Sequence, residues 1–168
     1  AARVSERELR TVDMPTREEN GVLYYEIDFD ALERAIDSRT KLLMLCSPHN
    51  PSGRAFARDE LEMLAALAER HDLTIISDEI HAELMLNGER HIPIASLAPE
   101  IAARTVTLMS ASKAFNIAGL CMAFAHFGSK ALRQRFEKMP AHIRGGTNTL
   151  AIAAVQAAWT AGQPWLDE

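Results

Sequence analysis

Short apolar runs alternate with longer amphipathic segments along most of the chain. The run 41–46 is apolar after its first residue, and 73–77 has the same character before it ends at Asp78. Runs of this length that lack a two-residue alternation are typical of strands buried on both faces, as in a parallel sheet. Two further strands are expected at 105–110 and 121–127.

The segments between these runs have the three- and four-residue spacing of amphipathic helices. The clearest is 58–71, which combines an apolar face with two acidic residues in its first turn. Asp28 is expected to cap a helix over 29–37, because its carboxylate can accept from first-turn N–H groups. Further helices are expected at 94–98, 129–139 and 149–161. The alternation of strands and helices predicts an α/β fold, whereas the first twenty residues predict mostly extended chain or loop.

Composition and charge exclude several function classes. Of the 168 residues 48% are hydrophobic, and 18 Lys and Arg stand against 23 Asp and Glu, which gives a net charge of −5. This balance argues against a nucleic-acid partner, since such a protein needs a basic surface to replace the counterions of phosphate. No apolar run reaches the ~20 residues that span a bilayer, so we expect no membrane partner and no signal peptide. Two cysteines are too few for a disulfide framework and favour a reducing, cytoplasmic compartment.

Polar residues follow three of the expected strands, at the edge where the carboxyl ends of parallel strands meet. In open α/β sheets, ligands bind outside this edge. Each group alone is as well explained by a turn or a helix cap. Together they bring a carboxylate, an amine, hydroxyls and an amide to one rim: Asn50, Asp78, His81, Ser110, Ser112 and Lys113.

One interpretation of this rim is a serine nucleophile. The segment Ser110-Ala111-Ser112-Lys113 matches the Ser-x-x-Lys element of penicillin-interacting enzymes, which also carry Ser-Asp-Asn and Lys-Thr-Gly. This chain offers only Ser77-Asp78-Glu79, which precedes the Ser-x-x-Lys element instead of following it, and it contains no Lys-Thr-Gly. We therefore reject this interpretation.

A lysine Schiff base with pyridoxal 5′-phosphate accounts for the same residues better. This chemistry needs an amine to hold the aldehyde and an acid to keep the pyridine nitrogen protonated. It also needs small donors for the phosphate and a polar group near the 3-hydroxyl of the ring. The chain supplies these groups as Lys113, Asp78, Ser110 with Ser112, and Asn50 with His81.

Three segments of the chain resemble the fold-type I pyridoxal-phosphate enzymes of the class I/II aminotransferase superfamily. They are 47–54 (Ser-Pro-His-Asn-Pro-Ser-Gly-Arg), 77–81 (Ser-Asp-Glu-Ile-His) and 110–120 (Ser-Ala-Ser-Lys-Ala-Phe-Asn-Ile-Ala-Gly-Leu). The second and third are most similar to the cystathionine β-lyase-like C–S lyases of the MalY/PatB group. Ordinary aminotransferases more often have tyrosine in place of His81. The similarity extends from about Tyr25 to Glu168.

The resemblance implies a fold and a set of roles. The fold is part of the large domain of the pyridoxal-phosphate-dependent transferase fold, a three-layer α/β/α arrangement around a mostly parallel sheet. In this family pattern Lys113 forms the Schiff base, Asp78 pairs with the pyridine nitrogen and Asn50 with the 3-oxygen. His81 takes the place of a tyrosine that does the same work in many relatives.

The phosphate site departs from the family pattern. The resemblance implies that Ser110 and Ser112 reach the phosphate. Many relatives add an arginine eight residues after the lysine, where this chain has Cys121. Phosphate binding must therefore depend on other donors. The remaining histidines lack the spacing of metal ligands, and we predict no metal.

The reaction that the resemblance implies is α,β-elimination from a small sulfur-containing amino acid such as cystathionine, which gives a thiol, pyruvate and ammonia. The amine of Lys113 would remove the Cα proton. Transamination shares the early steps, so a class I/II aminotransferase is the alternative function. The resemblance also implies a homodimer in the full-length protein.

The ends of the chain predict a piece of a larger domain. The chain begins at Ala1 and not at Met, and it ends just past a helix-like run. We expect residues 1–168 to be the central part of the large domain, truncated at both ends and running toward a small C-terminal domain. The resemblance places the Gly-rich phosphate loop, the ring-stacking aromatic and the substrate-carboxylate arginine outside it. A fragment without catalytic activity is therefore a second alternative.

Overall fold

A computed structural model describes residues 6–86 and 88–168, and the chain divides into two compact units, 1–41 and 42–168. The first unit contains an antiparallel hairpin of β1 (Thr16–Glu19) and β2 (Val22–Tyr25). Our expectation of extended chain or loop over the first twenty residues did not include the hairpin. Its signal was Asn20-Gly21, since both residues have positive φ (52° and 76°), as a two-residue hairpin turn requires.

The first unit also contains α1 (Phe29–Ala35), which begins as the sequence predicts. The carboxylate of Asp28 accepts the N–H of Ala31 at 2.8 Å. The helix ends two residues before the expected Asp37, because Ile36 is already extended. Arg10 then donates to the carbonyl of Ala35 (3.0 Å) and pairs with Asp37 (2.9 Å).

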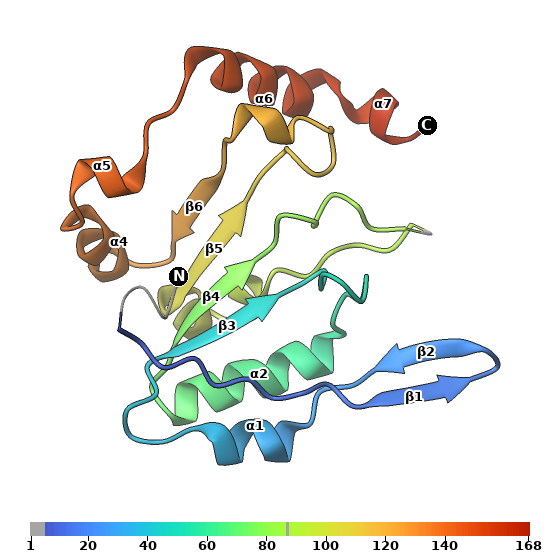
Figure 1. Ribbon diagram of the computed structural model, residues 1–168, viewed down its shortest axis with the longest axis vertical. Helices are drawn as coiled ribbons and strands as arrows, with labels where there is room; N and C mark the ends of the chain where they lie inside the picture. The colour runs from blue at the N-terminus through green and yellow to red at the C-terminus, as the bar shows by residue number, and fades with distance from the viewer. Residues whose placement is uncertain (1–5, 87) are drawn as a thin grey trace. The chain divides into compact units, whose positions relative to one another are not determined.

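The second unit is built on a four-stranded sheet in the order β3-β4-β5-β6. The strands are β3 (Leu42–Cys46), β4 (Thr74–Asp78), β5 (Thr105–Met109) and β6 (Phe124–Phe127). The pairs β3–β4 and β4–β5 are parallel and β5–β6 is antiparallel, as the arrows in Figure 1 show. All four predicted strands are present, and the sheet is mostly parallel, as expected. β6 begins three residues later than predicted.

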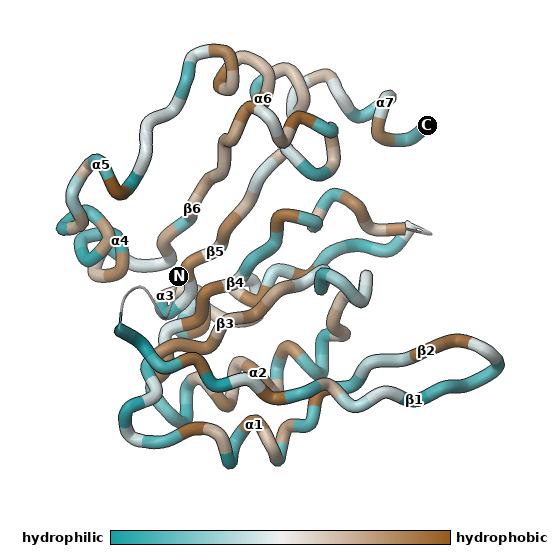
Figure 2. Tube along the Cα trace, in the orientation of Figure 1, coloured by the Kyte–Doolittle hydropathy of each residue, from teal (hydrophilic) through white to brown (hydrophobic). Residues whose placement is uncertain are grey.

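One face of this sheet carries the core. On β4 and β5 the side chains of Ile75, Ser77, Thr105 and Thr107 are all buried. The buried apolar side chains of α2 (Arg58–Arg70) and of the 3₁₀ helix η2 (Ile94–Ser96) complete the core. Apolar residues occur along β3, β4 and β5, where Figure 2 shows brown stretches in each strand.

The expectation that β3 is buried on both faces is wrong. β3 is one of the two outermost strands of the sheet, and its side chains alternate in exposure. Leu45 is 8% exposed, whereas Leu42 and Met44 on the opposite face are 52% and 64% exposed. A continuous apolar run therefore predicted the strand correctly but did not reveal that only one of its faces is covered by the described residues.

The helices agree with the sequence in place more than in length. α2 ends one residue early, at Arg70, and η2 is shorter than the helix expected over 94–98. α4 (Lys130–Glu137) lies within the helix predicted over 129–139, with Ser129 as its cap, and α6 (Thr149–Ala161) has the predicted bounds. The short helices α3 (Pro99–Ala103), η3 (Ala118–Leu120), α5 (Ala141–Arg144) and α7 (Gln163–Leu166) were not predicted. Among the described residues, no helix combines the length and apolar character that a membrane span requires.

Candidate active site at the carboxyl edge of the sheet

The three parallel strands bring the predicted residues to one edge of the sheet. Cys46 is in register with Asp78, and Asp78 with Leu108. The ladder continues beyond the strands, because Ser47 N–H donates to the carbonyl of Asp78 (3.0 Å) and Glu79 N–H to that of Leu108 (2.9 Å). Neighbouring strands lie about 4.8 Å apart. The segments that carry Asn50, Asp78 and Ser110 to Lys113 therefore leave the sheet side by side.

Asp78 ends the central strand of the three parallel strands and is half-buried. One of its carboxylate oxygens, Oδ1, accepts the backbone N–H of Ile80 at 3.2 Å. This bond closes a turn directly after the strand and fixes the direction of the carboxylate. A carboxylate held in this way at a strand end can receive a proton-bearing nitrogen of a ligand.

Lys113 lies on a tight turn after β5, and its side chain is exposed. The turn is held by two backbone bonds, from Phe115 N–H to Ala111 O (3.0 Å) and from Ile117 N–H to Ser112 O (3.1 Å). The alanines on either side, Ala111 and Ala114, are 0% and 4% exposed. Two buried small residues thus anchor the turn, and the amine between them is accessible to a ligand.

The two serines beside Lys113 are bonded to each other and to the chain. The Ser110 hydroxyl lies 2.7 Å from the carbonyl of Met122 and 2.8 Å from the Ser112 hydroxyl. A carbonyl oxygen can only accept, so the Ser110 hydroxyl donates its single proton to the carbonyl of Met122. The Ser112 hydroxyl then donates to the oxygen of Ser110. Ser112 can turn its proton outward by rotation. Ser110, which is buried, can do so only by giving up its bond to Met122.

Asn50 and His81 lie in loops at the same edge. Asn50 is exposed, in a turn where His49 N–H donates to Arg54 O and Gly53 N–H to His49 O, both at 2.7 Å. Gly53 has a φ of +70°, which favours glycine at this position. His81 is half-buried, and its carbonyl accepts the N–H of Leu84 at 2.9 Å.

Sequence reasoning missed two further carboxyl groups next to this edge. Glu79 is buried and is bonded to Ser77 and His91. Glu83 accepts a hydrogen bond from the Trp159 side chain, and burial raises its pKa even though that bond acts in the opposite direction. The ring of Trp159 lies 5.0 Å from that of Phe124. No spacing in the sequence pairs these residues, because their partners come from other segments.

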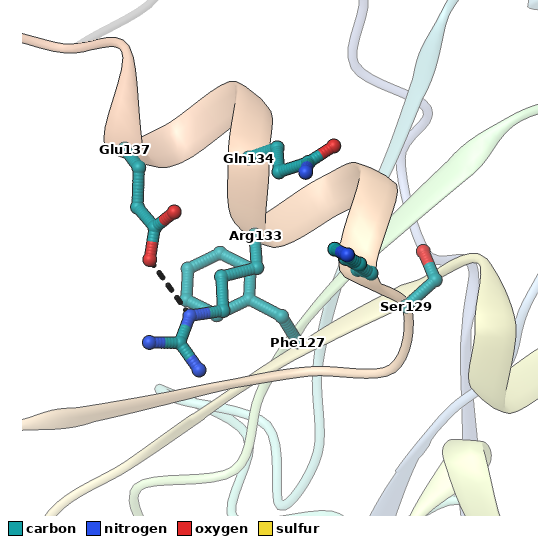
Figure 3. Close-up of a pocket in the computed structure, with 6 residues that line it drawn as sticks. Phe127, Ser129, Arg133, Gln134 and Glu137 are labelled. Atoms are coloured by element: carbon teal, nitrogen blue, oxygen red, sulfur yellow. Dashed lines mark hydrogen bonds and ion pairs between the residues drawn. The ribbon is translucent and has the colours of Figure 1, made fainter.

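A hollow of about 450 Å³ lies elsewhere, between β6 and α4. Phe127 lines it and is in register with Val106, near the start of β5, so the hollow is at the opposite edge of the sheet. Figure 3 shows Arg133 paired with Glu137 on its wall, at 2.8 Å. None of the predicted site residues lines it. Within residues 6–86 and 88–168, no three His, Cys, Asp or Glu side chains gather as a metal site would require.

Comparison with known proteins agrees with this geometry. The family described as aminotransferase class I and II matches residues 4–168, which begins well before Tyr25. Cystathionine beta-lyase PatB of Bacillus subtilis (strain 168) is 42% identical over 156 residues, which are 92% of this chain and 40% of that protein.

Solved structures give the same result for the fold. OvoB matches 98% of this chain and 43% of its own, with a TM-score of 0.88 and 43% identity. The PLP-bound C-S lyase from Staphylococcus hominis matches 97% of this chain and 40% of its own, with a TM-score of 0.80 and 36% identity. The expected fold is thereby confirmed.

The match to the relatives covers only part of their length. The chain spans about 40% of the curated relative PatB and a similar share of the two solved structures. Within that share, the family match covers nearly the whole chain, including all three segments that carry the resemblance. The chain belongs to the aminotransferase class I and II family.

Proposed function

We propose that the protein is a pyridoxal-phosphate-dependent C–S β-lyase. Its substrate would be a small sulfur-containing amino acid, and its products a thiol, pyruvate and ammonia. The observation that carries the proposal is the accessible amine of Lys113 on the turn after β5, the strand next to β4, which ends in Asp78. The cystathionine β-lyase and C–S lyase relatives favour elimination as the reaction.

The residues at this edge fit the chemistry of pyridoxal phosphate. An aldehyde needs an amine, a pyridinium nitrogen needs a carboxylate, and a phosphate needs hydroxyl or backbone donors. Lys113 and Asp78 supply the first two groups, and Ser112 supplies a hydroxyl that reaches outward by rotation alone. Asn50 and His81 would bond the 3-oxygen of the ring. When bound, the cofactor supplies an electron-accepting ring that stabilises negative charge at the substrate Cα.

The protein's own groups perform binding and proton transfer. The amine of Lys113 would hold the aldehyde of the cofactor, and the same amine would accept the proton from the substrate Cα. Asp78 would hold the proton of the ring nitrogen, and its Oδ1 already accepts the N–H of Ile80. Its direction is already fixed before a ligand binds, which reduces the ordering cost of binding.

An aminotransferase is the second candidate function. The family is described as aminotransferase class I and II, and the relatives include an aspartate aminotransferase of Bacillus sp. (strain YM-2) as well as cystathionine β-lyases. Transamination would use the same lysine for the same first proton transfer. The two functions separate after that step, when a thiolate either leaves Cβ or stays. The products therefore distinguish them: pyruvate and thiol from cystathionine for a lyase, and amino transfer that depends on a keto acid for an aminotransferase.

We further propose the setting in which this site works. Residues 1–168 would form the central part of a large cofactor-binding domain, and the protein would act as a homodimer. Cys46 and Cys121 are both free thiols, which favours the cytoplasm.

The test is to trap the lysine. The chain is mixed with pyridoxal phosphate, reduced with borohydride and digested, and the modified lysine is identified by mass spectrometry. We expect modification at Lys113 that Lys113→Ala abolishes. Lys130→Ala, which removes an equally exposed lysine at the opposite edge of the sheet, should leave it unchanged. Equal labelling of both lysines, or none at Lys113, would overturn the proposal.

The reaction is tested separately from cofactor binding. Pyruvate release from cystathionine is measured with the same three proteins. Release that requires Lys113 supports the lyase, and keto-acid-dependent amino transfer without pyruvate supports the aminotransferase. Trapping at Lys113 without either activity is the result expected of a catalytically incompetent fragment.

A further inference from the structure

A buried polar network lies directly behind Asp78 and has no part in the proposed chemistry. Its centre is Glu79, which is 3% exposed. One oxygen, Oε1, accepts the hydroxyl of Ser77 at 2.9 Å, and the other, Oε2, lies 2.8 Å from Nε2 of His91. The side chain of His91 is only 9% exposed.

The presence of this network needs an explanation, because a buried carboxylate is costly unless it is fully paired. Breaking such a pair by removing one partner destabilises a protein far more than the pair itself stabilises it. His91 moreover buries its second ring nitrogen, Nδ1, for which no hydrogen-bond partner exists among the described residues. Two buried apolar residues would be simpler here. The network therefore points to a requirement for direction rather than for stability.

The network fixes the direction of the turn that orients the Asp78 carboxylate. Side chains alternate along a strand, so Asp78 lies on the opposite face from Ser77 and Glu79, which are both buried. The next residue, Ile80, donates its N–H to Oδ1 of Asp78 at 3.2 Å. Whatever fixes Glu79 thus fixes the peptide that holds the Asp78 carboxylate.

His91 also closes the loop that carries His81. It lies twelve residues after Glu79, and its bond to Glu79 joins the two ends of that loop. At the start of the loop, Ala82 N–H donates to Glu79 O and Leu84 N–H to His81 O, both at 2.9 Å. One buried bond therefore holds two of the predicted cofactor-binding residues, Asp78 and His81, in place.

We propose that Glu79 and His91 are positioning residues, which fix the Asp78 carboxylate for the ring nitrogen of pyridoxal phosphate by anchoring the turn at Ile80. The role of Asp78 in this statement rests on the proposed function. The anchoring of the turn does not, and it is tested without any cofactor.

The first test measures amide hydrogen exchange in the chain without ligand. His91→Ala removes the donor to Glu79, and we expect exchange at the Ile80 and Ala82 amides to accelerate at least about tenfold. His91→Gln keeps an N–H near the position of Nε2 and should restore most of the protection. Leu61 N–H, bonded to the carbonyl of the α2 cap Ala57, is the reference amide and should not change.

The second test measures the affinity for pyridoxal phosphate in a double-mutant cycle with Asp78→Asn. If His91 acts through Asp78, His91→Ala weakens binding about tenfold in the wild-type background and not at all beside Asp78→Asn. Ile94→Val, which alters an equally buried core residue without a bond to Glu79, serves as the control for general loss of stability. Its effect should be small and additive in both backgrounds.

The outcomes separate the two proposals. Unchanged exchange at Ile80 in His91→Ala, or losses of affinity that add in the cycle, would overturn the positioning role. If His91→Ala does not fold, Ser77→Ala removes the other donor to the same carboxylate, and the same faster exchange at Ile80 is expected. Faster exchange at Ile80 in a chain that never binds pyridoxal phosphate would leave the anchoring intact and refute the proposed function.

Discussion

The two edges of the four-stranded sheet hold different kinds of surface. At the carboxyl edge, Lys113 is exposed and Asp78 is half-buried, each on a turn held by backbone hydrogen bonds. At the opposite edge lies the 450 Å³ hollow, where Arg133 is paired with Glu137 on the same helix. That ion pair is mostly exposed and contributes little. Strand direction, and not the presence of a hollow, therefore indicates where the reactive groups converge.

The largest expected effect concerns the edge without the site. Gly128 follows β6 and packs so closely on α3 that an added Cβ would lie 1.7 Å from the carbonyl oxygen of Ala102. Gly128→Ala should therefore lower the free energy of unfolding by about 3 kcal/mol, as overpacking against backbone does. Denaturant unfolding measures this.

The same variant sharpens the comparison of the two edges. Pyridoxal phosphate affinity, measured per folded molecule, should not change in Gly128→Ala, because this edge holds structure and not the ligand. Gly119→Ala is the matched control, since no atom lies within 4 Å of its added Cβ. A loss of affinity in Gly128→Ala without a loss of stability would contradict the division.

The second prediction removes the carboxylate at the ligand edge. Asp78→Asn keeps the shape but loses the charge that would hold a proton on the ring nitrogen. We expect the affinity for pyridoxal phosphate to fall by about 10- to 100-fold, the range for a hydrogen bond between charged groups. A fluorescence titration measures it. Glu137→Gln at the opposite edge should bind as the unmodified chain does, and equal losses in the two variants would remove the distinction between the edges.

Much of the second unit could be predicted because its signals are local. The apolar runs gave all four strands, and the spacing of apolar residues, as in α2, gave the main helices. The polar residues that follow the strands also predicted the carboxyl edge as the site, because parallel strands end at the same edge of the sheet. The exposed face of β3 could not be predicted, because it depends on which neighbours cover the strand. The turn at Asn20 is a different case, since its hairpin signal is local and was overlooked.

The candidate site shows the same limit at the level of single atoms. The sequence assigned Ser110 and Ser112 the same role, but the carbonyl of Met122, twelve residues away, distinguishes them. It gave His91 no role, because the carboxylate that His91 contacts is also twelve residues distant. Residue types at a strand end predict chemistry, whereas the proton that each group has available depends on partners that only the fold brings near.

The third prediction tests the difference between the two serines. Ser112→Ala removes a hydroxyl that can turn to a phosphate, so the affinity for pyridoxal phosphate should fall about fivefold, equivalent to one hydrogen bond of ~1 kcal/mol. Ser110→Ala leaves the carbonyl of Met122 without its donor, so stability should fall by ~1 kcal/mol or more. Thermal unfolding and cofactor titration of both variants measure the two effects. The reverse assignment, with Ser110→Ala affecting affinity alone, would show that Ser110 gives up Met122 to bind the phosphate.

The smallest expected effect concerns a titrating group in the loop after β4. Burial raises the pKa of Glu83 above its usual 4.5, so the folded state binds this proton more tightly than the unfolded chain does. The stability that this proton provides is complete below the unfolded pKa and is lost as the pH rises through the folded pKa.

Glu83→Gln removes the charge and keeps an oxygen that can accept from Trp159. It should therefore raise the stability at neutral pH by no more than about 0.5 kcal/mol, since Glu83 is half-buried and solvent still screens its charge. Well below the ordinary pKa of 4.5 the carboxyl is protonated in both states, and the difference in melting temperature should vanish. Glu89→Gln, at an exposed residue of the same loop, serves as the control variant. A stabilisation by Glu83→Gln that persists at low pH would mean that its cause is packing against Trp159 and not the buried charge.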